Sequence, residues 1–231
     1  MDRLGLTVFY IALSIAAFAF GKAVNRRARH PAANATLIAM LVVIAVLLLS
    51  HQNYAAYMRH GGGAIAWLLG PATVALGIPL ARHAKTMARE SWPIGAAIVA
   101  GAVSAAISAP LILSVLGGSK ILALSMAPKA VTTPIAMQIS AHIGGVPALA
   151  ALFAIVGGII VAIIAEPVLA RLGITDHRVF GLTAGVAGSG IGAAQAVSRN
   201  PQAGAYAALA VGVNAIVTAI LVPVFWSWHW L

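Results

Sequence analysis

A lysine followed by two threonines, inside an otherwise apolar stretch, is the group of residues in this sequence best suited to chemistry. Lys129, Thr132 and Thr133 lie in "APKAVTTPIAM" (127–137), between two long hydrophobic stretches. An ammonium group near the bilayer centre costs about 2.5–3.5 kcal/mol even on mild insertion scales, and charges kept there are usually functional. An ammonium beside hydroxyl donors is suited to hold a small anion. The alternative is a lysine that extends to a membrane interface near the start of its segment.

Further polar side chains fall in a second interrupted stretch, "VAGSGIGAAQ" (186–195). Ser189 and Gln195 there, and Gln138 in the first stretch, are candidate substrate contacts. For the hydroxyl groups the alternative is a hydrogen bond to their own helix backbone, which is common in membrane helices. Asn214 is a lone amide, which favours a bond between helices over ligand binding. The candidate substrate-binding residues are Lys129, Thr132, Thr133, Gln138, Ser189 and Gln195.

The remaining reactive residues form no pattern typical of an enzyme or a metal centre. The seven histidines lie at segment ends or in loops without ligand spacing, and the chain has no cysteine. No Ser/His/Asp set is visible, and "GSGIG" (188–192) lacks the preceding strand and the spacing of a dinucleotide fingerprint. We therefore expect no metal, no cofactor and no enzymatic activity.

Helix breakers surround both candidate groups. Prolines remove backbone donors and disfavour helix at the preceding residue, and glycines weaken helices. Irregular backbone at membrane depth survives where it is buried in protein or lines a wet cavity. Helix N-termini exposed at such breaks carry positive partial charge, which suits an anion. The predicted breaks are at Pro128, Pro134, Gly188, Gly190 and Gly192.

The composition requires lipid around most of the chain. Of the 231 residues, 61% are hydrophobic and 8% are charged, whereas soluble domains are about a quarter charged. A spanning helix needs about 20 apolar residues, and the apolar runs are continuous. The sequence therefore predicts an all-α polytopic membrane protein. Six spanning stretches are expected at about 4–20, 32–49, 64–80, 93–116, 145–165 and 203–225, and two interrupted segments at 119–143 and 180–198.

The formal charge of +10 is placed for membrane topology rather than for nucleic acid. Basic residues cluster in "KAVNRRARH" (22–30) and "ARHAKTMARE" (81–90), at the ends of hydrophobic stretches. Cytoplasmic loops carry such clusters under the positive-inside rule. Both termini are then expected on the outer side. The first apolar stretch lacks a cleavage site, so we expect a spanning helix rather than a signal peptide.

Each interrupted segment can either cross the membrane once or enter and return as a re-entrant hairpin. Hairpins place more Lys and Arg inside, so the positive-inside rule favours them. An internal repeat supports the hairpins, because a shift of 57 residues lays 148–163 on 205–220. The same shift lays 129–138 on 186–195. A hairpin plus one crossing, repeated from the opposite side, is an inverted-topology repeat of the kind found in secondary transporters. We predict a four-helix scaffold region at 1–117 and a repeat-built transport region at 118–231, divided into 118–174 and 175–231.

At "APKAVTTPIAMQISAHIGGVPALAA" (127–151) the sequence resembles the LrgB/CidB family. Further blocks at 68–80, 181–197 and 203–221 are similar to blocks of that family. Pro71 and Thr73, in the first of these blocks, are additional candidates to line the broken-helix region. The family usually carries His, Arg and Glu at the positions that are here Ser189, Gln195 and Ser198, and the 203–221 block, which usually begins E-G-A-F-S-S, here begins AGAYAA.

The resemblance implies a multi-pass protein of the bacterial inner (cytoplasmic) membrane, often encoded beside a small holin-like membrane partner of the LrgA/CidA type, and the charge distribution places both termini on its periplasmic side. Some members have been called murein hydrolase effectors. Others, including the plastid glycolate/glycerate translocator, carry small carboxylates. With the residue pattern, this predicts a homo-oligomeric transporter of small carboxylates such as glycolate, glycerate or pyruvate, working by exchange. The alternative is a holin-like regulator of murein hydrolase activity that acts with the small partner. No nucleic-acid partner is expected.

Overall fold

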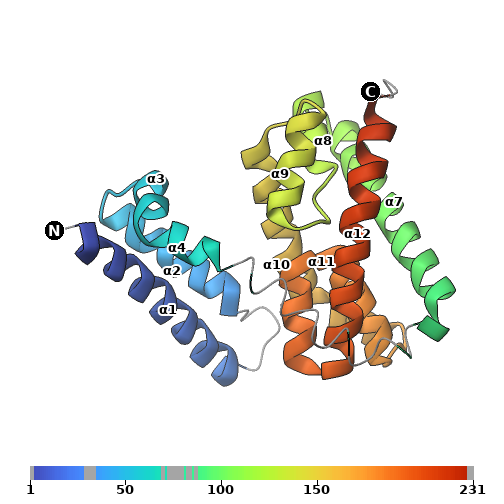
Figure 1. Cartoon of the computed structure of the whole chain (residues 1–231), viewed down its shortest axis with the longest axis horizontal. Coiled ribbons are helices and arrows are strands. Elements are labelled where there is room, and N and C mark those ends of the chain that lie inside the picture. Colours follow the sequence, from blue (N-terminus) through green and yellow to red (C-terminus); the bar gives the residue numbers. More distant parts are fainter. Residues whose placement is uncertain are drawn as a thin grey trace. The chain divides into compact units, whose positions relative to one another are not determined.

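The computed structural model describes residues 3–28, 35–68 and 88–227, together with the single residues 71, 81 and 85 (Figure 1). Every regular element in these ranges is helical. The chain divides into two compact units between Ala75 and Leu76. The boundary predicted at 117/118 separates a scaffold region from a transport region by function rather than by packing, and it stays a prediction.

The first unit is built on a long helix, α1 (Arg3–Ala28), against which α2 (Ala35–Leu49) packs. The two backbones come close at Gly21, where a Cβ would collide with the carbonyl group of Ala35. Small residues at such crossings let membrane helices approach and gain van der Waals contact. The basic last turn of α1 also opposes the negative end of its helix dipole.

A sharp bend follows α2. His51 has a φ of 51°, which ends the helix. The Asn53 side chain then caps the next helix by accepting a 2.8 Å hydrogen bond from the backbone N–H of Ala56. The axis turns by 112° between the helical runs before and after the bend. The second run consists of α3 (Tyr54–Tyr57), the π-helix η1 (Met58–Gly62) and α4 (Gly63–Trp67).

Four of the six predicted spanning stretches are helices that are long and apolar enough to cross a membrane. They are Leu4–Ala28, Ser91–Val115, Pro147–Arg171 and Pro201–Trp226. The predicted second span is shorter than expected, because α2 has 15 residues and a crossing needs about 20. It qualifies only as a bent pair with Tyr54–Trp67. The predicted third span, 64–80, lies almost entirely outside the described residues after Leu68.

The second unit combines three long helices with the two interrupted segments (Figure 1). At 25 to 27 residues, each long helix extends about 37–40 Å. Two of them begin at a proline, which is tolerated in the first turn because that N–H has no helical partner. The long helices are α7 (Ser91–Val115), α10 (Pro147–Arg171) and α12 (Pro201–Ser227), and the interrupted segments are α8 (Lys120–Met126) with α9 (Thr133–His142), and α11 (His177–Arg199).

The first interrupted segment folds back on itself. Helices α8 and α9 are separated by an irregular stretch from 127 to 132. The Ser125 hydroxyl accepts a 2.8 Å hydrogen bond from the backbone N–H of Val146, immediately before α10. A Cβ at Gly145 would lie 2.9 Å from the backbone nitrogen of Ser125. Since Ser125 is the penultimate residue of α8, the chain leaves the end of α8 and returns to it just before α10, so the segment between them folds back. We call α8, 127–132 and α9 hairpin 1.

The second interrupted segment also folds back, although its helix is nearly continuous in sequence. Its backbone breaks at Ser189, with φ 50° and ψ −138°. A Cβ at Gly192 would collide with the backbone of Ala184, whereas these residues would lie about 12 Å apart along an unbroken helix. The arms 177–188 and 190–199 therefore lie side by side and antiparallel. We call α11 hairpin 2.

The two hairpins are connected to opposite ends of α10, and their tips reach the middle of the long helices. Hairpin 1 leads into the first turn of α10, and hairpin 2 follows its last turn. Near the middle of α10, a Cβ at Gly158 would lie 3.0 Å from the carbonyl oxygen of Gly188 in hairpin 2. In α7, a Cβ at Gly101 would lie 2.7 Å from the side chain of Val186. The tip of hairpin 2 thus meets the central parts of two long helices.

The helix packing around hairpin 2 depends on alanine and glycine. Gly181 and Gly185 in its first arm come so close to α12 that a Cβ at either position would collide with the carbonyl groups of Ala203 and Ala207. Buried alanines fill the rest of this interface. Larger side chains would hold the arms away from α12, so the small-residue composition is what allows a hairpin to fit among spanning helices.

The fold-back geometry can be tested by cysteine labelling, because the chain has no native cysteine. Suitable sites for single cysteines are the exposed positions Leu116 and Ala141, which lie just before hairpin 1 and in its last turn, and the exposed positions Leu172 and Ser198, which lie just before hairpin 2 and in its last turn. We expect a membrane-impermeant maleimide to label the first pair from one side of the membrane and the second pair from the other. If Leu116 and Ala141 label from opposite sides, hairpin 1 is a crossing and the fold-back is wrong.

Candidate functional site

The tips of the two hairpins meet at a single buried amide. Asn214, which is 1% exposed, is the central residue of α12. Its Nδ2 donates a 2.8 Å hydrogen bond to the carbonyl oxygen of Ala130 in hairpin 1 and a 3.2 Å bond to that of Val186 in hairpin 2. The hydroxyl of Thr218, one turn further along α12, donates to its Oδ1 at 3.4 Å. The predicted role of Asn214 as a bond between elements is confirmed.

The tip of hairpin 1 carries Lys129, next to the carbonyl group that Asn214 binds. Its side chain is half-buried and makes no ion pair with any acid in the described ranges. Thr132 is the N-cap of α9, but its hydroxyl makes no capping hydrogen bond. Pro134 stands in the first turn of α9, where backbone N–H groups have no helical acceptor. An ammonium group, a threonine hydroxyl and a positive helix end are thus close together in sequence.

The tip of hairpin 2 carries Ser189 in a strained conformation. Positive φ is uncommon for a residue other than glycine and costs about 1–3 kcal/mol. Ser189 is 5% exposed, and its hydroxyl has no hydrogen-bond partner within the part of the chain that the structure describes. Buried polar atoms without partners are rare, and a bound ligand is one of the explanations for such an atom. Of the predicted hydroxyl groups, Ser189 therefore has the strongest support as a ligand contact.

Other predicted residues lie away from the tips. Gln138 and Gln195 each follow the break in their hairpin by six residues, about 9 Å along the helix axis. Gly192 packs against Ala184 and shapes the hairpin rather than lining a site. Pro71 is exposed, and Thr73 lies outside the described residues. The structure thus brings together the two tips, with Lys129, Thr132 and Thr133 on one and Ser189 on the other, and it does not bring the glutamines to them.

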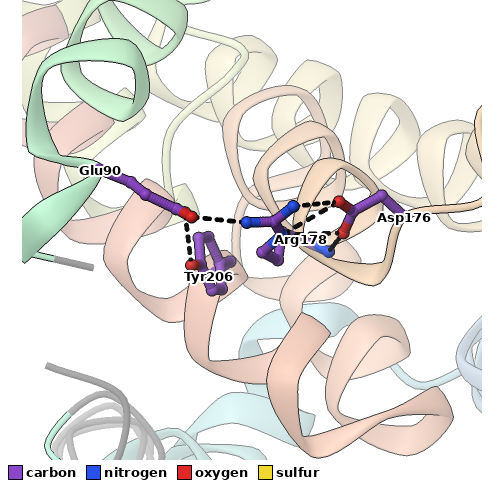
Figure 2. Close-up of polar contacts among 4 residues, drawn as sticks. All are labelled: Glu90, Asp176, Arg178 and Tyr206. Atoms are coloured by element: carbon purple, nitrogen blue, oxygen red, sulfur yellow. Dashed lines mark hydrogen bonds and ion pairs between the residues drawn. The ribbon is translucent and has the colours of Figure 1, made fainter. Parts of the chain in front are cut away.

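A charged cluster that the sequence pattern did not predict lies at the foot of hairpin 2 (Figure 2). Arg178, in the first turn of α11, pairs with Glu90 before α7 at 2.5 Å and with Asp176 at 2.6 Å. The hydroxyl of Tyr206 in α12 donates a 2.9 Å hydrogen bond to the other oxygen of Glu90. Hydrogen bonds from Arg178 hold the pKa of Asp176 below its usual value. The cluster ties the first arm of hairpin 2 to α7 and α12.

The second arm of hairpin 2 ends in another ion pair, because Arg199 contacts Glu166 of α10 at 2.9 Å. Together with the Arg178 cluster, this ion pair means that every acidic side chain after residue 75 has an arginine partner. Glu90 and Arg178 are 88 positions apart, and no spacing rule connects them. The one sequence signal was Tyr206, which occupies the Phe position of the family block and adds a hydroxyl there.

Within the described ranges, no group of three His, Cys, Asp or Glu side chains is placed to hold a metal ion. The groups at the tips are an ammonium, hydroxyls and backbone amides, which are suited to an anion rather than a cation.

A model of the LrgB-like family matches residues 14–228 of the chain. The chain belongs to this family. The chain is 30% identical over 214 residues to an uncharacterised protein of Haemophilus influenzae, covering 93% of this chain and 92% of the relative. It is 28% identical to the holin-like protein CidB of Staphylococcus epidermidis, over 94% of each chain. It is 31% identical to the antiholin-like protein LrgB of Bacillus cereus, over 81% of each chain.

The predicted resemblance to the LrgB/CidB family is therefore confirmed. The names of the CidB and LrgB relatives agree with the holin-like function better than with carboxylate transport, which neither name mentions. The family and the apolar helices agree in making this a multi-pass membrane protein. No solved structure matches the chain.

Replacement of Tyr206 by phenylalanine tests the cluster at the foot of hairpin 2. The variant removes one hydrogen bond to Glu90 and leaves the buried ring in place. We expect a loss of about 1 kcal/mol, which corresponds to about 2–4 °C in the unfolding temperature of the detergent-solubilised protein. The matched control is Tyr54→Phe, since the Tyr54 ring is exposed. Equal unfolding temperatures for both variants and the parent would show that the cluster does not stabilise the fold.

Proposed function

We propose that this LrgB-like protein carries a small carboxylate across the membrane, through the site where the two hairpin tips meet. The observation that supports this most is the meeting of both tips at the central residue of α12. Hairpins that enter from opposite sides and end at mid-depth give a site that each side can reach in turn. Such discontinuous elements hold substrate near the bilayer midplane in many secondary transporters.

The arrangement is proposed to be an inverted repeat of two re-entrant hairpins, each followed by a spanning helix. The 57-residue shift pairs Thr132 with Ser189, and the structure breaks the helix at both positions. It also pairs Asn214 with Gly157, and the residue next to Gly157 approaches the tip of the other hairpin. Each spanning helix thus contacts the hairpin of the other copy at its centre. The predicted repeat boundaries, 118–174 and 175–231, fit this plan.

The substrate class follows from the charge at the tips. Lys129 would provide the counter-charge for one carboxylate, and the hydroxyls of Thr132 and Ser189 would donate hydrogen bonds to its oxygens. Charge-assisted hydrogen bonds of this kind are about twice as strong as neutral ones. Glycolate, glycerate and pyruvate each present one carboxylate and at least one further oxygen, which are the groups that the proposed site would bind. Thr133, Gln138 and Gln195 remain proposed secondary contacts.

A second candidate function is favoured by the names of the relatives. CidB of Staphylococcus epidermidis is named holin-like and LrgB of Bacillus cereus antiholin-like. By this proposal the chain would regulate murein hydrolase activity in the inner membrane, together with a small holin-like partner. The names support this candidate more directly than they support transport. A regulator, however, has no evident need for an unneutralised lysine beside two hairpin tips at mid-depth.

Transport by purified protein decides between the two candidates, and Lys129 is the residue to change. We expect proteoliposomes containing the parent chain to exchange labelled pyruvate or glycolate, and Lys129→Ala to lose this activity at least about tenfold, which corresponds to about 1.4 kcal/mol of lost interaction. Lys129→Arg should rescue only in part, because the planar guanidinium is larger and differently shaped. Initial rates of label uptake measure the effect.

The matched control is Lys120→Ala, which removes an exposed lysine at the start of the same hairpin. It should leave the exchange rate within about twofold of the parent, since screened surface charges contribute little. Full activity of Lys129→Ala would show that this lysine extends to an interface. No uptake of any small carboxylate by folded parent protein would leave the holin-like candidate in place.

The same charge predicts how transport is coupled. A bound carboxylate neutralises Lys129, whereas the empty site must carry an unpaired cation or lose a proton. An uncompensated buried ion costs several kcal/mol, and each 1.4 kcal/mol on a barrier is about tenfold in rate. We expect carboxylate exchange to be at least about tenfold faster than net uptake at neutral pH. Higher internal pH should narrow the difference, because a deprotonated amine returns more easily.

Counterflow in proteoliposomes with and without internal unlabelled substrate measures this difference. Equal rates in both conditions, unaffected by pH, would contradict a mechanism in which Lys129 is neutralised by the substrate.

A further inference from the structure

We infer that Asn214 is a positioning residue that couples the two hairpin tips, so that neither tip moves away from α12 independently of the other. The inference rests on the proposed function for its effect on transport, but the coupling itself is a property of the fold. It concerns a residue that would contact no substrate.

Both hydrogen-bond donors of this amide are used, and its oxygen also accepts a bond. A primary amide has two N–H donors and one carbonyl acceptor. One N–H binds the carbonyl oxygen of Ala130, the other binds that of Val186, and the oxygen accepts from Thr218. Asn214 and Thr218 are 1% and 2% exposed. Each tip therefore depends on one of two hydrogens carried by the same nitrogen atom.

The location makes these bonds hard to replace. Both acceptors are backbone carbonyls beside helix breaks, where the usual helical donors are missing or displaced. At membrane depth, water is not generally present to take over a lost hydrogen bond. If one tip moves, the amide must either follow it and strain the bond to the other tip or leave a buried carbonyl without a donor. Both outcomes link the positions of the tips.

The remaining contacts of the tips do not supply such a link. The tip of hairpin 2 packs against Gly158 in α10 and Gly101 in α7 through apolar contacts. The tip of hairpin 1 packs with alanines and valine of α10 and α12. These contacts tolerate small sliding movements, whereas a hydrogen bond loses strength steeply with distance and angle. Among the described residues, Asn214 is the side chain that hydrogen-bonds both tips.

The test uses paired spin labels on the two tips, in nanodiscs and without any substrate. The label sites are Pro134, which is exposed, and Gly190, where an added Cβ meets nothing within 4 Å. In the parent, we expect one narrow distance distribution. Asn214→Leu keeps the size of the side chain but removes both donors, so displaced conformers should become about fivefold more populated, as expected for one hydrogen bond of about 1 kcal/mol.

The control is Gly157→Ala, which changes the position on α10 that the repeat pairs with Asn214 and has open space around it. It should leave the distribution unchanged. Thr218→Val provides a milder second variant, because it keeps both donors but removes the bond that orients the amide. It should raise the displaced population by about twofold. An unchanged distribution in Asn214→Leu, or in Thr218→Val if the first variant does not insert, overturns the inference.

Transport then separates positioning from simple stability. Using pyruvate as the probe, Asn214→Leu should raise the KM for exchange at least about tenfold. Its unfolding temperature should fall further than that of Tyr206→Phe, because two buried carbonyls lose their donors, so the change in KM is what identifies a positioning role. A parallel fall in stability with no change in KM would mean a structural role only. If the parent transports nothing, the spin-label result still decides the coupling, and the proposed function alone fails.

Discussion

Two backbone carbonyls beside broken helices need donors deep inside an apolar protein, and the side-chain amide of Asn214 supplies both. Without it, the carbonyl groups of Ala130 and Val186 would lack these bonds at a depth where water is scarce. The hairpins can end at mid-depth because one polar residue stands at the centre of a spanning helix. The position of Asn214 along α12 therefore fixes how far each tip extends, and with it the depth of the candidate site.

The small residues make the same arrangement possible sterically. Hairpin 2 has glycines at the positions where it approaches α12 and α10, and alanines fill the spaces between. Lipid gives no hydrophobic drive for helices to associate, so close packing and buried hydrogen bonds must provide the stability. This explains why the chain is rich in alanine and glycine where the hairpins lie. The ion pairs at the feet of hairpin 2 add a third kind of contact at its ends.

Much of this fold could be predicted from the sequence, and the failures have physical causes. The apolar runs predicted the long helices, and Pro128 and Pro134 marked the break in hairpin 1. Ser189 stood out through its flanking glycines and its match to Thr132. The 112° bend after α2 was missed, because a capping asparagine and a positive φ act locally inside an apolar region. The Arg178 cluster was missed because its partners come from three separate helical regions, and sequence periodicity reports only neighbours on one helix.

The distribution of charge connects the fold to the chemistry of the site. All acids beyond residue 75 lie at the feet of hairpin 2, where Arg178 and Arg199 neutralise them. Lys129 lies at the tip of hairpin 1, away from these ion pairs. No acid among the described residues pairs with it. A lysine held there costs about 2.5–3.5 kcal/mol in a bilayer. An anion that enters between the tips would remove most of that cost on binding, and it would also find the unpartnered hydroxyl of Ser189. In the proposed transport mechanism, the residue that makes the empty site unfavourable would also make the occupied site selective for an anion.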